Sequence, residues 1–205
     1  DNNQVWLCIS IMISFDKQTI RAKSRQEITS LSKSYRQKAD GQIQSKLIFL
    51  RVFKNATSIC SYVSTNNEVD THQIIRETLL AKGSIIVPKI QGAALELYSI
   101  RSFEELKMGS FGIVEPQTKR AHTPIQSVDL FIVPGIAFGR DGSRIGRGKG
   151  YYDRLLQTIH VPIVALAYDC QVFDTIPHGA KDKKVDIIIT ETHIYDLMNS
   201  SISSV

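Results

Sequence analysis

The residues best suited to bind a ligand or do chemistry run from Arg144 to Asp153, with the sequence RIGRGKGYYD. Within this stretch, three glycines alternate with basic residues, at Gly146, Gly148 and Gly150. Glycine lets the backbone adopt positive φ angles and approach a ligand closely, and successive exposed N–H groups can bind an anion. Together with the positive charges, these features predict a cradle for a polyphosphate. The alternative is a flexible basic turn at the surface.

The spacing of the glycines excludes two familiar nucleotide-binding loops. A Walker loop would need glycine at position 143 and Ser or Thr at position 150, where this chain has Ser143 and Gly150. The dinucleotide fingerprint G-x-G-x-x-G does not fit, because the spacing here is G-x-G-x-G. The stretch therefore belongs to neither class.

A carboxylate follows the basic stretch directly, at Asp153. Magnesium bound beside phosphates takes one or two carboxylates from the protein, so Asp153 is a candidate ligand. Asp182 and Asp186, in the segment KDKKVD, are candidates for a second ligand. The alternative is that Asp153 lies in the first turn of a helix and interacts with the helix dipole.

Helical and strand-like segments must position these residues. Short apolar runs bounded by polar residues predict strands at 57–63, 84–88, 128–135, 162–169 and 185–191, with proline ending the second. Helical spacing predicts one or two helices within 17–54, with breaks near 30–34 and 40–41, and further helices at 70–83 and 151–159. We expect Asp70 to cap the helix at 70–83 and Gly83 to follow its end.

This alternation predicts the α/β class, with a mainly parallel sheet flanked by helices on both faces in a single domain. In such sheets, ligands bind beyond the carboxyl ends of the strands. The stretch 144–153 follows the strand at 128–133 and leads into the helix at 151–159. The predicted phosphate site therefore lies at the edge of the sheet where a ligand is expected.

The composition is that of an ordinary globular protein of 205 residues, with a net charge of +5 and a pI of about 9.1. A mildly basic chain fits either an anionic ligand or nucleic acid. The three cysteines are widely spaced, so they predict neither a disulfide framework nor a zinc site, and we expect a reducing intracellular compartment. The five histidines have no metal-ligand spacing.

The two ends of the chain are expected to lie outside the working domain. Residues 5–15 are mostly apolar but too few to span a bilayer. Two interpretations of residues 1–11 stay open, a leader or upstream segment and a short buried strand. The Ser-rich residues 199–205 are expected to form a flexible tail.

The stretch VDLFIVPGIAFGRDGSRIGRGKGYYDRLL closely resembles the signature of the 5-formyltetrahydrofolate cyclo-ligase family. Further segments resemble the family in the same order, namely KQTIRAKSRQEITSLS, SYVSTNNEVDTHQII, GSIIVPKI, GSFGIVEP and VALAYDCQVFDTIP. The resemblance covers about residues 17–191, and we expect the family's domain to occupy residues 12–198.

This resemblance implies a reaction. The family converts 5-formyltetrahydrofolate to 5,10-methenyltetrahydrofolate with ATP and Mg²⁺ and releases ADP and phosphate. The implied intermediate is an iminium phosphate, in which the formyl group is phosphorylated. We further expect a monomer in the cytoplasm, with an organelle as the alternative compartment. The sequence has no recognised nucleic-acid-binding motif, and the aromatic residues do not interleave with the basic ones, so we expect no nucleic-acid partner. We expect no membrane partner either.

The resemblance also implies roles in ATP binding and catalysis. Lys17 and Arg21, four residues apart on one helix face, match residues that contact ATP phosphates. The ATP-binding loop corresponds to Arg144, Gly146, Arg147, Gly148, Lys149, Gly150, Tyr151 and Tyr152. Within this loop, Lys149 is expected nearest the transferred phosphoryl group. Arg147 and Tyr152 complete the expected catalytic set.

Folate and metal are expected to bind beside the same loop. Glu68 matches an acid that hydrogen-bonds the pterin, and Phe111 falls where the family often has an aromatic residue. The loop residues implied to border the folate are Arg147, Gly148, Lys149, Gly150 and Tyr151. Asp153 and Asp182 match the magnesium ligands, and Asp186 remains the alternative for the second.

Overall fold

The computed structural model describes residues 16–109, 114–117, 120–179 and 182–198. Three subjects of the sequence analysis lie outside the described residues, namely the segment 1–11, Phe111 and the tail 199–205. Within the described ranges, none of the helices is long and apolar enough to cross a membrane.

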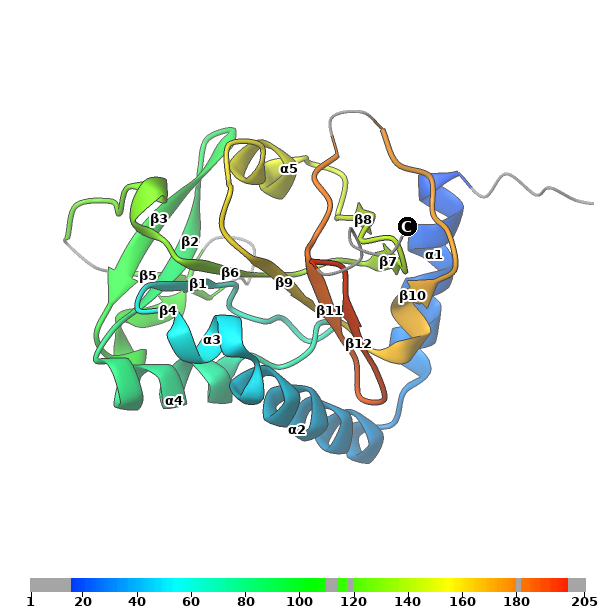
Figure 1. Cartoon of the computed structure of the whole chain (residues 1–205), viewed down its shortest axis with the longest axis horizontal. Helices are drawn as coiled ribbons and strands as arrows, with labels where there is room; N and C mark the ends of the chain where they lie inside the picture. The colour runs from blue at the N-terminus through cyan, green and yellow to red at the C-terminus, as the bar shows by residue number, and fades with distance from the viewer. Residues whose placement is uncertain (1–15, 110–113, 118–119, 180–181, 199–205) are drawn as a thin grey trace, which may run out of the picture.

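The main sheet contains seven strands among the described residues, in the order β12-β11-β9-β6-β1-β2-β3 (Figure 1). The five inner strands are mutually parallel, and the two edge strands β3 and β12 are antiparallel to their neighbours. The inner strands are β1 (Ile59–Ser61), β2 (Ile85–Gln91), β6 (Leu130–Val133), β9 (Ile163–Leu166) and β11 (Ile187–Ile189). The edge strands are β3 (Ala94–Ile100) and β12 (Ile194–Asp196). The predicted mainly parallel sheet is thus confirmed.

The strand order reverses beside β1. The chain passes from β1 to β2 on one side, and then returns to place β6 on the other side of β1. Connections that leave two adjacent parallel strands in opposite directions open a crevice beyond their carboxyl ends. The fold therefore places a ligand site beyond the ends of β1 and β6.

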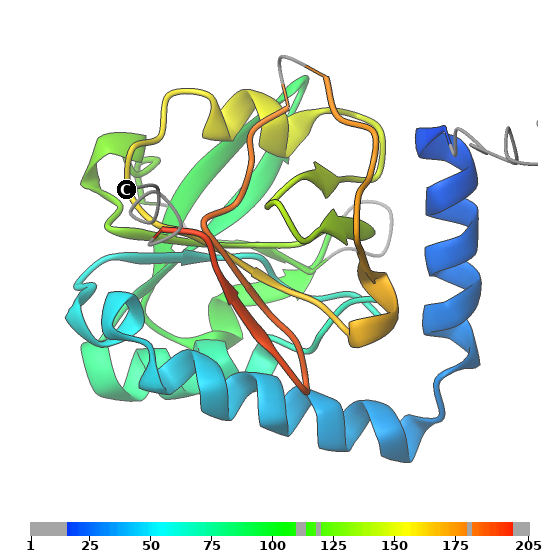
Figure 2. The ribbon, with the colours of Figure 1, turned by 45° about the vertical axis from the view of Figure 1, so that its right-hand side comes forward.

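Helices cover both faces of the sheet, as predicted. Side chains of α2 (Lys33–Phe49) and α4 (His72–Lys82) pack on one face, and α5 (Tyr151–Leu156) packs on the other. The short α3 (Arg51–Asn55) follows α2 (Figure 1). Helix α1 (Lys17–Ser30) stands to the side of the molecule (Figure 2). It contacts strand β7 (Ala137–Gly139) and the 3-10 turn η5 (Asp169–Gln171).

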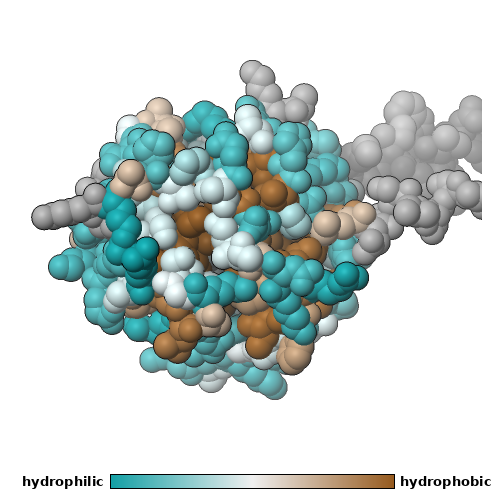
Figure 3. Space-filling model, turned by 60° about the vertical axis from the view of Figure 1, so that its left-hand side comes forward, coloured by the Kyte–Doolittle hydropathy of each residue, from teal (hydrophilic) through white to brown (hydrophobic). Residues whose placement is uncertain are grey.

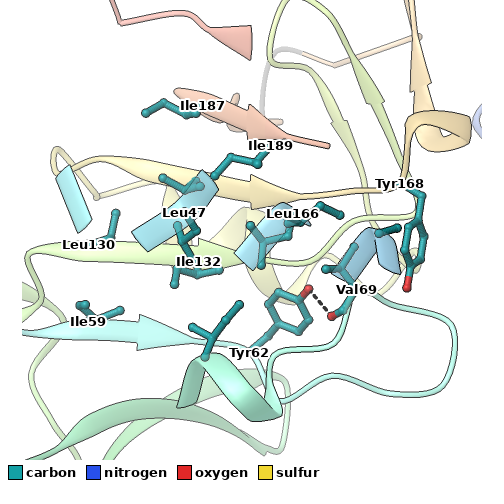
Figure 4. Close-up of a cluster of buried hydrophobic side chains, with 14 of the residues drawn as sticks. Leu47, Ile59, Tyr62, Val69, Leu130, Ile132, Leu166, Tyr168, Ile187 and Ile189 are labelled. Carbon is teal, nitrogen blue, oxygen red and sulfur yellow. Dashed lines mark hydrogen bonds between the residues drawn. The ribbon is translucent and has the colours of Figure 1, made fainter. Parts of the chain in front are cut away.

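The core forms because alternate residues of each inner strand face opposite layers. On β6, Leu130 and Ile132 pack toward α2 and α4, and Phe131 packs into the other layer. Figure 4 shows the first layer, where Leu47 of α2 lies over the side chains of the sheet. Burying one such apolar side chain contributes about 1.5–3 kcal/mol relative to leaving it exposed.

Smaller elements surround this core. A second sheet is formed by β7 (Ala137–Gly139), β8 (Arg144–Ile145) and β10 (Val172–Phe173), and β4 (Leu106–Met108) pairs with β5 (Val114–Pro116). The 3-10 turns are η2 (Phe103–Glu105), η4 (Ile125–Ser127) and η5 (Asp169–Gln171).

Apolar and polar side chains are mixed on the face shown in Figure 3, where the apolar ones form separate patches.

Two predicted helix features need correction. Helix α2 runs without a break through Gly41, because Ala39, Ile43 and Leu47 form one buried face that continues across the glycine. The N-cap of α4 is Thr71 and not Asp70, whose side chain instead accepts a hydrogen bond from the backbone of His72 at 3.3 Å. The break near 30–34 is confirmed, since α1 ends at Ser30 and α2 begins at Lys33.

Glycine ends α4 as predicted, but proline does not end β2. Gly83 has φ of 75°, a conformation that residues with a Cβ avoid. Strand β2 continues through Pro88 to Gln91 because it pairs with β3 along this length. The β1–β2 ladder pairs Cys60 with Ile86, ahead of the proline, so the missing N–H of Pro88 falls where that ladder has ended.

Candidate active site

Two adjoining cavities lie beyond the carboxyl ends of β1 and β6 in the described part of the chain, with volumes of about 620 Å³ and 240 Å³. Both are lined by residues of the basic glycine loop that the sequence analysis singled out. The residues common to the two linings are Arg144, Gly146, Gly150 and Asp153. The loop therefore forms the boundary between the two cavities.

The larger cavity has mostly apolar walls with a few polar groups. The segment after β1 contributes Tyr62, Val63, Thr65 and Glu68, and the segment after β6 contributes Pro134, Gly135 and Ile136. The β2–β3 hairpin adds Pro88, Ile90 and Leu95, and the glycine loop adds Arg147, Lys149, Tyr151 and Tyr152. Such a lining is typical of a binding site for a small molecule.

The smaller cavity is lined mainly by charged side chains and glycine backbone. Its cations are Lys17 and Arg21 of α1 and Arg144 of β8, and its carboxylates are Asp153 and Asp182. The remaining lining comes from Ile145, Gly146, Gly148 and Gly150. Side chains separated by up to 165 positions thus meet around one small volume.

The glycine loop has the conformation that its sequence predicts. Gly148 and Gly150 have φ angles of 104° and 66°, which are strained for residues with a Cβ. Arg21 fixes the start of the loop, because its Nε donates a hydrogen bond to the backbone oxygen of Gly146 at 2.8 Å. A positively charged side chain from α1 is therefore part of the loop's support.

Arg144 is a buried cation between the two cavities, with only 2% of its side chain exposed. Its Nη2 donates to Asp153 Oδ1 at 2.6 Å, and its Nη1 donates to the backbone oxygen of Pro134 at 3.3 Å. Its Nε is buried without a hydrogen-bond partner among the described residues. The guanidinium also lies over the ring of Tyr152, 5.6 Å from the ring centroid. Arg144 thus carries positive charge, and one unused donor, to the boundary between the cavities.

Asp182 is held in a comparable ion pair at the other side of the smaller cavity. It pairs with Lys17 and accepts a hydrogen bond from the Gly179 backbone N–H at 2.7 Å. Burial acts to raise the pKa of Asp182, but the Gly179 N–H and Lys17 more than offset it, so the pKa lies below its ordinary value. The carboxylate therefore stays charged at neutral pH.

Asp186, the alternative to Asp182, has a different environment. Its carboxylate accepts a hydrogen bond from the backbone N–H of Ile163 at 2.8 Å, at the start of β9. It is not among the residues that line either cavity. Asp182 is thus the one of the two that lies with Asp153.

Glu68 and Arg147 form an ion pair across the larger cavity. Arg147 Nη2 donates to Glu68 Oε1 at 2.8 Å and to Thr65 Oγ1 at 2.7 Å. The other carboxylate oxygen of Glu68 accepts from the backbone N–H of Thr65 at 2.8 Å. Only 11% of the Glu68 side chain is exposed. Two residues that the resemblance assigns to the folate site are thus in direct contact.

The tyrosines of the loop differ in their surroundings. Tyr152 packs against both layers of the core, and burial raises its pKa well above the ordinary value, so its hydroxyl stays protonated. The hydroxyl of Tyr151 lies 3.4 Å from the backbone oxygen of Gly92, at the tip of the β2–β3 hairpin. Tyr152 can therefore donate a hydrogen bond, but it is a poor base.

A divalent cation could be held by the carboxylates of the smaller cavity. Among the described residues, no group of three or more His, Cys, Asp or Glu side chains is arranged to hold a metal ion. Asp153 and Asp182 could supply one or two oxygen ligands, and a bound anion and water would supply the rest. This donor set fits magnesium bound together with phosphate groups.

The sequence analysis missed several residues of the site. Thr65 contacts both Arg147 and Glu68, and it lies within the segment SYVSTNNEVDTHQII that carried part of the resemblance. The hairpin residues that wall the larger cavity, Pro88, Ile90 and Leu95, had no chemical signal in the sequence. Their position follows from the sheet order, which a single sequence does not specify.

The fold and the site define an α/β protein with a two-part ligand site, built around one basic glycine loop at the carboxyl edge of its sheet. A family model matches most of the sequence of this chain. The chain belongs to the 5-formyltetrahydrofolate cyclo-ligase family, whose model matches residues 13–191. The resemblance noted in the sequence and the predicted fold class are both confirmed.

Relatives along most of the chain carry the same name. The mitochondrial 5-formyltetrahydrofolate cyclo-ligase of Arabidopsis thaliana is 30% identical over 207 residues, covering 87% of this chain and 75% of its own. The mouse 5-formyltetrahydrofolate cyclo-ligase is 28% identical over 196 residues, covering 89% of this chain and 97% of its own. These names describe a ligase, so the expectation that the chain is an enzyme of this class is confirmed.

A solved structure supports the fold directly. The structure of 5,10-methenyltetrahydrofolate synthetase from Aquifex aeolicus matches with a TM-score of 0.81 and 36% identity. The match covers 89% of this chain and 93% of the Aquifex chain. The two proteins therefore share one fold along most of their length.

Proposed function

We propose that this chain catalyses the ATP- and Mg²⁺-dependent cyclisation of 5-formyltetrahydrofolate to 5,10-methenyltetrahydrofolate, with release of ADP and phosphate. The observation that carries this proposal is the glycine loop shared between an apolar cavity and a cationic cavity. A reaction that transfers a phosphoryl group from one ligand to another needs both ligands at a common boundary. Family membership indicates the folate as one ligand, and the sequence resemblance implies ATP as the other.

The larger cavity is proposed to bind the folate. Its volume of about 620 Å³ lies within the range of about 300–1,000 Å³ usual for small-molecule sites. The carboxylate of Glu68 would accept hydrogen bonds from the N–H donors of the pterin ring. Arg147 occupies one oxygen of that carboxylate here, so the pterin must share this oxygen or displace the arginine. A displaced Arg147 would be free to turn toward the reacting phosphoryl group.

The smaller cavity is proposed to bind the phosphates of ATP. Lys17, Arg21 and Arg144 would neutralise phosphate charge, and the backbone of the glycine loop would donate N–H groups. Asp153 and Asp182 would hold Mg²⁺, which when bound neutralises phosphate oxygens and orients them. Both carboxylates now pair with cations of the same cavity, Arg144 and Lys17. When magnesium and phosphate bind together, the two carboxylates would pair with the metal ion and the two cations would pair with phosphate. No charged group would then be left without a partner.

The chemistry follows from the poor leaving ability of a formyl oxygen. The formyl oxygen attacks the γ-phosphorus of ATP and ADP leaves, which gives an iminium phosphate at the formyl carbon. The N10 nitrogen of the folate then attacks that carbon and the ring closes. N10 releases its proton to water, and phosphate departs to leave the methenyl bridge between N5 and N10. The enzyme contributes mainly by positioning and by stabilising charge on the transferred group. We assign the latter role to Lys149 and Arg147, while Tyr152 would act through a hydrogen bond.

An absorbance assay for the methenyl product tests the proposal. Protein, 5-formyltetrahydrofolate and Mg²⁺ are mixed with and without ATP, and growth of the product absorbance is expected only with ATP. Lys149→Ala should lower turnover at least about 100-fold, a typical loss when a charge-stabilising donor is removed. Lys38→Ala, at an exposed lysine of α2, serves as the control and should retain full activity. If folded native protein yields no product, the proposal is wrong.

The remaining expectations concern the environment of the protein. We propose that it acts as a monomer without a nucleic-acid or membrane partner. We retain the cytoplasm as the expected compartment, with an organelle as the alternative. The mitochondrial designation of the Arabidopsis relative is compatible with the second choice.

A further inference from the structure

We propose that Asp40 and Tyr168, which line neither cavity, are positioning residues that hold the segment 62–71 so that Glu68 faces the folate. The segment joins β1 to α4 and includes Tyr62, Val63, Thr65 and Glu68 of the larger cavity. This inference rests on the proposed function, because it assigns the order of the segment to folate binding.

The segment lies between regular elements and needs support from elsewhere. Its two ends are joined by the Thr71 hydroxyl, which donates to the backbone oxygen of Tyr62 at 2.8 Å. The hydroxyl of Tyr62 in turn donates to the backbone oxygen of Val69 at 2.9 Å, the contact drawn as a dashed line in Figure 4. These bonds close the segment on itself, but they do not fix it to the rest of the molecule.

Arg147 of the glycine loop contacts Thr65 and Glu68 from one side of the segment. Asp40 of α2 supplies a second external attachment. Its Oδ1 accepts hydrogen bonds from the Asp70 backbone N–H at 3.2 Å and from the Tyr168 hydroxyl at 2.8 Å. Arg36, one turn earlier on the same helix, donates to the backbone oxygen of Asn66. Helix α2 therefore holds the segment on both sides of Glu68.

Tyr168 fixes the orientation of the Asp40 carboxylate. The Tyr168 side chain is fully buried, and Figure 4 shows its ring beside Val69 at the edge of the core. Asp40 is half-buried, so its carboxylate needs hydrogen-bond donors to offset lost hydration. Burial raises the pKa of Asp40, and the hydrogen bonds from Tyr168 and Asp70 act in the opposite direction. Without the tyrosine hydroxyl, the carboxylate would turn toward water and release the Asp70 N–H.

The consequence should be confined to one of the two ligands. Residues 62–71 line the larger cavity and do not line the smaller one. Disorder in this segment would move Glu68 away from the pterin while leaving the residues that line the smaller cavity in place. Loss of preorganised support of this kind weakens binding even when the contacting side chain itself is intact.

Three substitutions and one control test the inference. Tyr168→Phe keeps the ring and removes the hydroxyl, and Asp40→Ala removes the acceptor. Asp40→Asn keeps an oxygen that can accept both hydrogen bonds, so it should behave nearly as the native protein. The control is Tyr35→Phe, at a tyrosine of α2. It also removes a hydroxyl that donates to a carboxylate, because Tyr35 donates to Glu191 at 2.6 Å, but this contact lies outside the segment 62–71.

Kinetic constants for the two substrates give the main readout. Tyr168→Phe and Asp40→Ala should raise KM for 5-formyltetrahydrofolate about tenfold, the effect of roughly one lost hydrogen bond. KM for ATP should stay within about twofold, and neither constant should change in Tyr35→Phe. Equal increases in both KM values would show a general structural role and overturn the inference.

Hydrogen exchange of the ligand-free protein gives a readout independent of activity. Backbone amides of residues 64–71 should exchange faster in Tyr168→Phe and Asp40→Ala than in the native protein, but not in Tyr35→Phe. Unchanged exchange would refute the inference, as would faster exchange with an unchanged KM for folate. If the native protein neither binds nor converts 5-formyltetrahydrofolate, the proposed function fails and the inference falls with it. If the native protein binds 5-formyltetrahydrofolate and Tyr168→Phe and Asp40→Ala bind it equally tightly, the positioning role is refuted while the proposed function stands.

Discussion

Replacing Asp153 by asparagine tests how much the ion pair with the buried Arg144 contributes to the stability of the folded protein. Asp153→Asn removes the negative charge and keeps the shape of the side chain. Arg144 is 2% exposed and Asp153 is 28% exposed, and the two groups are 2.6 Å apart. In the native protein, the guanidinium is therefore out of water and the carboxylate is partly hydrated.

The size of the effect lies between two known limits. Removing one partner of a fully buried ion pair costs about 3–5 kcal/mol, whereas an exposed pair contributes about 0–1 kcal/mol. Arg144 keeps its hydrogen bond to Pro134, and asparagine still offers an oxygen acceptor. We therefore expect the free energy of unfolding to fall by about 2 kcal/mol, between these two limits, because the charge is lost while hydrogen-bond acceptors remain.

Urea unfolding of the ligand-free protein measures this loss. With a slope of about 2 kcal/mol per M, the midpoint should shift down by roughly 1 M. Asp182→Asn is the matched comparison, because its partner Lys17 is 35% exposed, and it should lower the free energy of unfolding by less than about 1 kcal/mol. An Asp153→Asn midpoint equal to that of the native protein would refute the reasoning about Arg144.

The same variant also tests the proposed metal role. A non-hydrolysable ATP analogue should raise the native unfolding midpoint more with Mg²⁺ than with a chelator, because ligands that bind only the folded state stabilise it. In Asp153→Asn this difference should largely disappear. An unchanged difference would remove Asp153 from the magnesium site while leaving the ion-pair result intact.

Further predictions concern single residues of the site and its support. Glu68→Gln should raise KM for 5-formyltetrahydrofolate about tenfold or more with KM for ATP unchanged, and an equal rise in both would contradict the assignment. Lys17→Met should weaken ATP binding about tenfold in calorimetric titrations and leave folate binding intact, so unchanged ATP affinity would exclude Lys17 from the phosphate site. Burial acts to raise the pKa of Asp141, but hydrogen bonds from Lys184 and Ser143 more than offset it and hold the pKa at about 2, below its usual 3.8. Native protein should therefore be more stable than Asp141→Asn at neutral pH, and this difference should vanish as the pH falls from about 4 to about 2. Urea unfolding of both proteins over this pH range measures the difference. A stability difference between native protein and Asp141→Asn that persists at about pH 2 would contradict that account.

The sequence allowed the fold class and the glycine loop to be predicted for clear physical reasons. Inner strands such as β6 and β9 are continuous apolar runs, because both their faces are buried. The loop is contiguous, so its glycines and basic residues can be recognised without knowing the fold. Short strands such as β8 (Arg144–Ile145) have too few residues to show a period, and the sequence analysis missed them.

The pairing of charges in the site could not be predicted from the sequence. Arg147 and Glu68 are 79 positions apart, and their contact depends on the strand order that places β6 beside β1. The burial of Arg144 likewise arises from packing against Tyr152 and not from any local pattern. The resemblance assigned Glu68 and Arg147 to one substrate, but only the structure brings them into contact.

The most direct test of the central claim is to measure both products in one reaction mixture. Native protein with 5-formyltetrahydrofolate, ATP and Mg²⁺ is sampled over time, and ADP and 5,10-methenyltetrahydrofolate are quantified by chromatography. A single loop that couples the two cavities predicts one ADP for each methenyl product, with both formed in parallel and both lost together in Lys149→Ala. Methenyl product without ADP, or steady ADP formation without methenyl product, would contradict the account.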